Sequence, residues 1–312
     1  MQNRNNNELH DFTDTLDISY LIKLFINEKR IIISFAFIFA TLLMLYSFAL
    51  PNIYQSKALL APVQSNNSMS GAMQNYSGLA SLAGVNLPND TSNNNNANKA
   101  KEKIKSLSFF EDSILPKIFL PELMAVKSWD ANANIIEFDD NVYDIKTKKW
   151  VMNASYPKTR IPSAQESYKI FQENHLIFID NKDTGFVTIA VKHQSPFVAQ
   201  KWTELIVTEI NSYYRNKDKN EADKAIDYLN SQLSNTNLAE IKQATASILQ
   251  EQIQKLTLIE ANEYYVFDYI DRSVVMESKI GPKRFIYPIY GFIFGLILSF
   301  LIIFTKQYVS RL

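Results

Sequence analysis

The chain has 312 residues, of which 46% are hydrophobic, and its 32 basic residues balance 32 acidic ones. This neutral balance leaves no basic field for nucleic acid. The absence of cysteine excludes disulfides, thiol catalysis and thiolate metal sites.

The first strong pattern is an uncharged apolar run from Ile31 to Leu50, preceded by Lys29 and Arg30 and ended by Pro51. A helix of about twenty residues covers the roughly 30 Å hydrocarbon core of a membrane. A signal peptide is the competing interpretation, but it fits poorly because the run is long and a sizeable polar segment precedes it. We therefore predict a transmembrane helix over residues 31–50.

After this run, "NIYQSKALLAP" (52–62) has the β-branched and alternating residues of a strand. Residues 64–98 are rich in Asn, Ser and Gly, which predicts a mobile loop around a small apolar island at 77–85. A helix is then expected from Lys99, after an asparagine cap, to about Pro116.

The next part of the chain reads as short strands and turns. Residues 134–151 indicate strands around a polar turn, and Ser163 with Glu166 forms the pattern of a capping box at a helix start. Residues 175–193 predict a β-hairpin with its turn in the polar stretch 181–185.

Two long helices follow. Apolar residues at three- and four-residue steps predict the first over 195–234, with Ser195 as its N-cap. Its charged middle, 215–224, shows no apolar stripe and is expected to stand in water or to face another subunit. The second helix is predicted over 238–261, and residues 263–275 read as a strand that leads back to the membrane.

A second apolar run, "FIYPIYGFIFGLILSFLIIF", predicts a transmembrane helix over residues 285–304. Pro282 lies just before it, at the membrane interface, and Pro288 lies in its first turns, where a proline can kink a helix. Small residues recur every fourth position along one face, at Gly291, Gly295 and Ser299. Such a face lets another helix approach closely, although glycine is also simply frequent in membrane helices. Its partner could be the first span, a neighbouring subunit or another membrane protein.

Charge around the spans predicts the topology. Lys23, Lys29 and Arg30 precede the first span and only Lys57 follows it closely, so the positive-inside rule places the N-terminus in the cytoplasm. The charges around the second span are mixed. The predicted divisions are a cytoplasmic tail (1–30), a first span (31–50), an outer segment (51–284), a second span (285–304) and a cytoplasmic tail (305–312).

No pattern indicates catalysis, a cofactor or a metal. None of the seven glycines belongs to a G-x-x-x-x-G-K-[ST] pattern, so no phosphate-binding loop is predicted. The histidines look isolated along the chain, and adjacent carboxylates in a strand would point to opposite faces. These residues are His10, His175 and His193, with the pairs Glu111/Asp112 and Asp139/Asp140.

Taken in order, several segments resemble one family. They are "DISYLIKLFINEKR" before the first span, "YQSKALLAP" after it, "GLASLAG", "PSAQESYKIF", "TGFVTIAVKHQSPFVAQKW", "EYYVFDYIDRSVVMES", and the prolines at 282 and 288 before the glycine-bearing span. This arrangement resembles the polysaccharide co-polymerases, the Wzz-like chain-length determinants of O-antigen and related bacterial surface polysaccharides.

The resemblance implies an α+β membrane protein, with two transmembrane helices flanking a periplasmic α/β base that carries a long helical arm. It implies a homo-oligomeric ring of about eight subunits in the bacterial inner membrane. It also implies no enzyme activity and no cofactor. Such proteins set how many repeat units a separate membrane polymerase adds to a lipid-linked glycan.

Two other functions remain open at this stage. A membrane scaffold or adaptor for polysaccharide export would share the hairpin and the oligomer. An enzyme such as a glycan hydrolase would need a cleft with convergent carboxylates, and none is spaced for that role.

Overall fold

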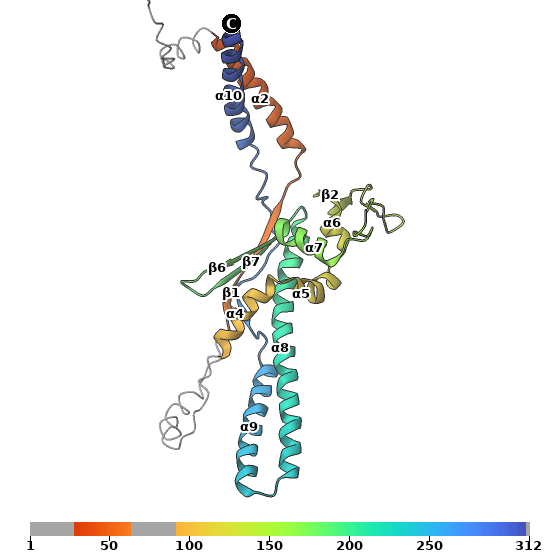
Figure 1. Ribbon diagram of the computed structural model, residues 1–312, viewed down its shortest axis with the longest axis vertical. Helices are drawn as coiled ribbons and strands as arrows, with labels where there is room; N and C mark the ends of the chain where they lie inside the picture. The colour runs from red at the N-terminus through yellow and green to blue at the C-terminus, as the bar shows by residue number, and fades with distance from the viewer. Residues whose placement is uncertain (1–27, 64–91, 310–312) are drawn as a thin grey trace, which may run out of the picture. The chain divides into compact units, whose positions relative to one another are not determined.

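The computed structural model describes residues 28–63 and 92–309 (Figure 1). They fall into two units. One contains the terminal helices α2 (Lys29–Ala49) and α10 (Ile286–Val309), and the other runs from Asn52 to Ile280. The apolar island expected at 77–85 lies outside the described residues.

The two terminal helices have the length and composition to cross a membrane, with mean hydropathies of 2.4 and 2.3. In the most apolar stretch of each helix, only 17% of the residues of α2 and 22% of those of α10 are buried. A core helix of a soluble protein would bury most of such a surface. Exposure of so much apolar surface therefore favours a membrane environment for both helices.

The second unit is built on a four-stranded antiparallel sheet with the order β6-β7-β1-β8. Its strands are β6 (Leu176–Asp180), β7 (Val187–His193), β1 (Tyr54–Pro62) and β8 (Phe267–Asp271). Tyr54 pairs with His193 at one end of β1, and Leu60 pairs with Val187 toward the other. Beyond β8, the Ile280 amide donates to the Ile53 carbonyl at 2.8 Å, so the two chain segments that connect to α2 and α10 are joined here.

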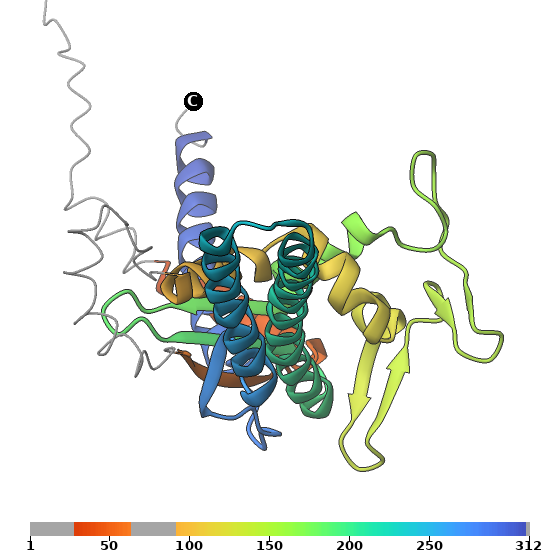
Figure 2. The same cartoon turned by 90° about the horizontal axis from the view of Figure 1, so that it is seen from below.

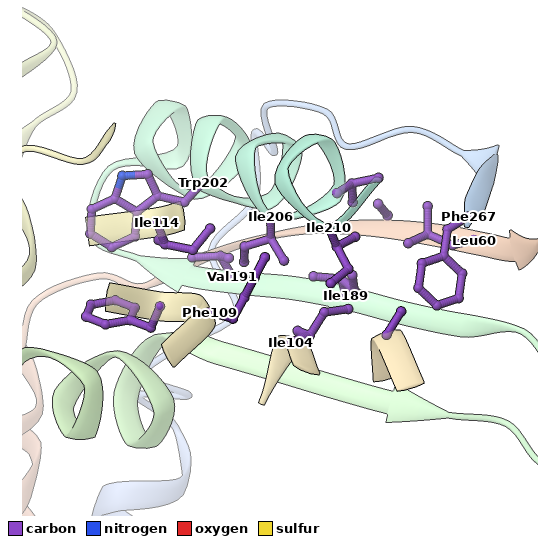
Figure 3. Close-up of a cluster of buried hydrophobic side chains, with 14 of the residues drawn as sticks. Leu60, Ile104, Phe109, Ile114, Ile189, Val191, Trp202, Ile206, Ile210 and Phe267 are labelled. Atoms are coloured by element: carbon purple, nitrogen blue, oxygen red, sulfur yellow. The ribbon is translucent and has the colours of Figure 1, made fainter. Parts of the chain in front are cut away.

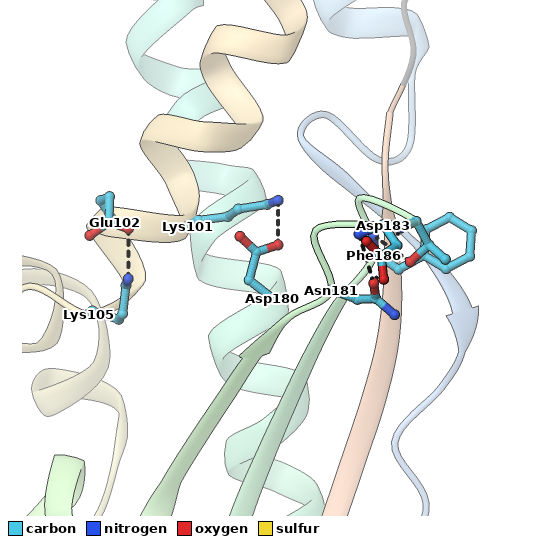
Figure 4. Close-up of polar contacts among 8 residues, drawn as sticks. Lys101, Glu102, Lys105, Asp180, Asn181, Asp183 and Phe186 are labelled. Carbon is cyan, nitrogen blue, oxygen red and sulfur yellow. Dashed lines mark hydrogen bonds and ion pairs between the residues drawn. The ribbon is translucent and has the colours of Figure 1, made fainter.

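The hairpin predicted at 175–193 is confirmed as β6 and β7. In its turn, the Asn181 side chain accepts from the backbone amides of Asp183 and Thr184, and Gly185 adopts a positive φ of 73° that glycine tolerates without strain. At the end of β6, Lys101 of α4 (Ser92–Ile104) forms a 2.6 Å ion pair with Asp180 (Figure 4). The hairpin is thus held to a neighbouring helix.

Helix α8 (Pro196–Asn235) supplies one side of the core. Its buried residues at four-residue steps pack toward the sheet, where alternate side chains of β7 face them (Figure 3). The other side chains come from α4 and from the short helices α5 (Leu107–Phe109) and η1 (Phe110–Ile114), which η2 (Leu115–Lys117) follows. Labelled members of this cluster are Leu60, Ile104, Phe109, Ile114, Ile189, Val191, Trp202, Ile206, Ile210 and Phe267.

The charged middle of α8 corrects one expectation. The buried stripe continues beyond Ile210 through Tyr214, Asp218 and Ala222, although the sequence showed no apolar stripe there. Asp218 is buried because it accepts hydrogen bonds from the Tyr265 hydroxyl and from Asn96 of α4. Hydrogen-bonded polar groups replace apolar ones in this part of the stripe, so the same chain covers one face of residues 215–224.

Helix α9 (Ala239–Ala261) lies beside the outer part of α8 (Figures 1 and 2). The bounds of α8 and α9 agree with the predicted helices to within one residue. Lys219 and Glu260 pair between them, while Arg215 donates to the carbonyls of Asn262 and Glu263. Large apolar side chains of α9 nevertheless remain exposed, namely Ile241, Ile248, Ile253 and Leu258.

A smaller lobe follows η2 and lies to one side of the long helices in Figure 2. It contains α6 (Leu120–Met124), β2 (Val126–Asp130), β3 (Ile135–Phe138), β4 (Tyr143–Asp144) and β5 (Lys149–Trp150), and it leads into α7 (Ala164–Ile170) and η3 (Phe171–His175). The predicted capping box is confirmed at the start of α7, where Ser163 and Glu166 exchange hydrogen bonds with each other's backbone amides.

Two predicted boundaries are wrong. The helix expected from Lys99 to about Pro116 begins at Ser92 and ends at Ile104, because Ala97, Ala100 and Ile104 form a buried face that extends into the asparagine-rich stretch. The chain then turns, and Ser106 caps the next helix instead. The strand expected over 263–275 is confined to β8. Finally, the Ser195 side chain makes no capping hydrogen bond, although the residue occupies the N-cap position of α8.

One buried amide holds the chain that returns from α9 onto α8. The Asn211 side-chain oxygen accepts from the backbone amides of Tyr265, Val266 and Phe267, at 3.1, 2.7 and 3.0 Å. Its nitrogen donates to the carbonyls of Val207 and Phe267, both at 3.0 Å. This one side chain supplies hydrogen-bond partners for the backbone amides and a carbonyl where β8 begins.

We expect Asn211→Ala to lower the free energy of unfolding of the second unit by about 3 kcal/mol, because several buried backbone groups lose their partner together. Thermal unfolding of the purified full chain in detergent, followed by near-UV circular dichroism, measures the change. Asn230→Ala, at an exposed position of the same helix, is the matched control. Equal midpoints for the two variants would contradict the role given to Asn211.

Candidate functional site

The small-residue face of the second span lies against α2 within the same chain. Gly291 and Gly295 are buried, while the residues between them are exposed. A Cβ atom added at Gly291 would lie 2.5 Å from the Phe39 carbonyl oxygen and 2.8 Å from the Ala40 Cα. One added at Gly295 would lie 2.7 Å from the Ala36 Cα. These distances are too short for any side chain, so the backbones of α2 and α10 meet at the two glycines.

The face continues on both sides of the glycines. Ser299 is 1% exposed, and its hydroxyl donates to the Leu296 carbonyl of its own helix at 2.9 Å. One turn further along, Ile303 packs with Ile32 of α2. Phe292 and Phe294 meet Phe37 and Phe39 edge to face, with ring centroids 6.0 and 5.5 Å apart. Aromatic rings therefore flank the close approach of the two backbones.

The two prolines lie at the start of this span and not within its packed face. Pro288 is the third residue of α10. The first four amides of a helix have no partner within the helix, so proline removes no hydrogen bond here and α10 needs no kink. Pro282 precedes the helix. Between the prolines, the Arg284 guanidinium lies 5.1 Å from the centre of the Phe48 ring, which joins the start of α10 to the end of α2.

A second group of polar residues lies around a cavity of about 220 Å³ in the second unit. The histidines that look isolated in sequence come together here, and that expectation was wrong for His175 and His193. Their ring centroids are 5.6 Å apart, because β6 and β7 pair across the hairpin. Both rings also pack against Trp202 of α8. The signal that sequence reasoning missed is the hairpin itself, which places residues near its two ends side by side. His10 lies outside the described residues.

Hydrogen bonds determine which nitrogen of the His193 ring carries the proton. The Ser195 amide donates to Nδ1 of His193, so its Nε2 carries the proton and donates to the Glu122 carbonyl at 2.9 Å. Burial is the main cause that lowers the pKa of His193 to about 4, and it also lowers the pKa of His175. Burial raises the pKa of the Glu122 carboxyl, against the attraction of Lys201. His193 is therefore a neutral, structural histidine near pH 7.

The chemistry available to these groups is limited. Within residues 28–63 and 92–309, no three His, Cys, Asp or Glu side chains lie close enough to hold a metal ion. Both ring nitrogens of His193 are engaged with backbone groups, so that ring is not placed as a general base. The cavity thus offers hydrogen-bonding groups but no metal site and no placed general base among the described residues. The close packing of α2 against α10 is the more distinctive candidate site.

These observations define a class, a protein in which two candidate transmembrane helices flank an α+β unit. Residues 14–114, a stretch that includes α2, β1 and α4, match the family model Wzz, described as chain length determinant protein. The resemblance to the Wzz chain length determinants is therefore confirmed. A solved structure of a "full-length bacterial polysaccharide co-polymerase" is similar at 11% identity and a TM-score of 0.39, with 96% of this chain and 99% of that chain covered. A comparison with curated proteins gives no match.

The histidine pair predicts a pH dependence of stability. The unfolded chain binds a proton at His193 near pH 6.5, whereas the folded chain resists until about pH 4. The free energy of unfolding should therefore fall as the pH decreases between these values, by on the order of 3 kcal/mol. His193→Gln should lose most of this slope, and His175 should supply what remains. The free energy of unfolding of the wild type and of His193→Gln, measured between pH 4 and 6.5, tests this prediction. Parallel plots of that free energy against pH for the two proteins would contradict it.

Proposed function

We propose that this protein is a non-enzymatic regulator of the chain length of a bacterial surface polysaccharide such as O-antigen, acting beside a separate membrane polymerase. The observation that carries the proposal is the family match over residues 14–114, which spans the first candidate transmembrane helix and the strand that follows it. The absence of any indication of catalysis in the sequence agrees with a regulatory role. The growing lipid-linked glycan is then a partner, and no cofactor is needed.

The proposed location is the bacterial inner membrane, with residues 51–284 in the periplasm. The tails at 1–30 and 305–312 are then cytoplasmic. The excess of basic residues before the first span supports this orientation. The outer unit is connected to both α2 and α10, so a single unit lies between two membrane anchors.

The proposed assembly is a homo-oligomeric ring of about eight subunits, with closed symmetry. Its support in this chain is the arm formed by α8 and α9. Tyr228, Leu238 and Leu258 are 64%, 64% and 60% exposed, and other large apolar side chains of α9 are exposed as well. Apolar groups repeated along an extended hairpin favour contact with neighbouring copies of the same arm.

In this proposal, Gly291, Gly295 and Ser299 hold the two spans of each subunit together. Pro282 and Pro288 determine how the chain begins the second span. The close helix pair presents its remaining faces to the lipid, to a neighbouring subunit or to the polymerase. Separating α2 from α10 would change that outer surface without altering the periplasmic core, so length control should be sensitive to these glycines.

We therefore expect Gly291→Leu/Gly295→Leu to insert and accumulate, while the polysaccharide loses its preferred length and shifts toward short, unregulated chains. Each lost close contact between the helices costs on the order of 1 kcal/mol. Electrophoresis of surface polysaccharide from a deletion strain that expresses either protein gives the length distribution. Ile293→Leu/Ile297→Leu, which introduces the same residue type at exposed positions of the same helix without a change of bulk, is the matched control.

The outcomes separate the hypotheses. A wild-type ladder in the glycine variant, at equal protein level, would contradict the packing role. A ladder that is unchanged after full deletion would contradict length control. Loss of exported polymer without a change in its length would favour the scaffold or export adaptor.

A further inference from the structure

The small lobe displays a surface of unusual composition between β4 and α7, which we call the 145–161 surface. It holds five basic residues and no acidic one, namely Lys146, Lys148, Lys149, Lys158 and Arg160. All five are exposed. Apolar side chains are exposed among them, with Ile145 and Val151 each at 45%, Ile161 at 61% and Tyr156 at 98%. Basic and apolar side chains are thus exposed along the same segment of the chain.

The fold places these side chains outward while it buries others from the same segment. Tyr143 is 4% exposed and packs edge to face against Trp150, Phe119 and Phe138, with ring centroids 5.1 to 6.1 Å apart. This aromatic cluster gives the β4–β5 hairpin a firm base. The lobe therefore has a core of its own, and the apolar groups of the 145–161 surface are left outside it.

The nearest acidic groups are engaged in local structure. The Asp144 carboxylate accepts from the hydroxyl of Thr147 and from the backbone amides of Lys146 and Thr147, and these hydrogen bonds lower its pKa. Glu166 takes part in the capping box of α7 and pairs with Lys158 at 2.7 Å. Both carboxylates are charged at neutral pH, yet the surface keeps a positive excess, with three lysines in the β4–β5 hairpin alone.

The root of the lobe is attached to the strand that follows the first span. Trp129 of β2 meets Tyr54 edge to face at 5.4 Å and also contacts Phe197 at the start of α8. Tyr54 comes four residues after Leu50, the C-cap of α2. The lobe therefore packs against the strand that directly follows the first span in the chain.

We propose that the 145–161 surface binds the anionic phospholipid headgroups of the membrane that α2 and α10 cross. Lysine and arginine attract the headgroup phosphates, while tyrosine and aliphatic side chains are accommodated at the boundary between headgroups and acyl chains. An anionic glycan would satisfy the basic groups but would leave Ile145, Val151 and Ile161 in water. The inference rests on the membrane placement of the two spans and not on control of glycan length.

The chain contains no cysteine, so Tyr156→Cys gives a single labelling site for an environment-sensitive fluorophore. The labelled full-length protein is placed in nanodiscs of phosphatidylcholine, alone or mixed with phosphatidylglycerol. In the mixture we expect a blue-shifted emission and about twofold stronger quenching by lipids that carry a shallow nitroxide. A neutral aqueous quencher should become correspondingly less effective.

Two controls keep the result specific. A label at Asn230→Cys, an exposed polar position on α8, should respond to neither lipid. Adding Lys146→Gln/Lys148→Gln/Lys149→Gln to the Tyr156→Cys protein should abolish the response, while the far-UV circular dichroism stays unchanged because all three lysines are exposed. Equal quenching at 156 in both lipids would overturn the proposal. So would protection that depends on protein concentration or on added glycan instead of lipid charge.

Discussion

The fold depends on the pairing of β1, the strand that follows the first span. Its central position in the sheet gives it two partners, β7 on one side and β8 on the other. The chain that leaves β8 leads to the second span, and the Ile280 amide is bonded to the Ile53 carbonyl. After β7 has paired with one edge of β1, the chain must therefore return so that β8 can pair with the other edge. This requirement explains why Asn211 binds the backbone of residues 265–267, where the return is completed.

Helix α8 runs without a break from the sheet to the part that lies beside α9. Trp202 and Ile206 belong to the core, and the same stripe continues through Tyr214, Asp218 and Ala222 to the part that pairs with α9. A continuous helix with a continuous buried face is stiff, so a contact made by the arm is mechanically linked to the sheet and to the two strands that lead to the spans. In the proposed function, this link would join assembly outside the membrane to the packing of α2 and α10.

Much of this architecture follows from local patterns in the sequence. The spans, the long helices, the hairpin and the capping box at Ser163 each depend on periodicity or on turn chemistry within a short segment. The features that sequence reasoning missed depend on partners far along the chain. Asp218 is buried only because Tyr265 and Asn96 reach it, and His175 meets His193 only through strand pairing. Among the site residues, the spacing of the glycines predicted a close approach, but only the folded structure identifies α2 as the helix they meet.

The central proposal is that α2 and α10 form a membrane hairpin that holds the α+β unit outside the cytoplasm. Because the chain has no cysteine, single cysteines report on which side of the membrane each part lies. Cells that express Asn230→Cys or Glu28→Cys, both at exposed positions, are treated with a membrane-impermeant maleimide after the outer membrane is opened. We expect Asn230→Cys to be labelled in intact spheroplasts and Glu28→Cys to be labelled only after lysis. Labelling of Glu28→Cys in intact spheroplasts, with protection of Asn230→Cys, would contradict this topology.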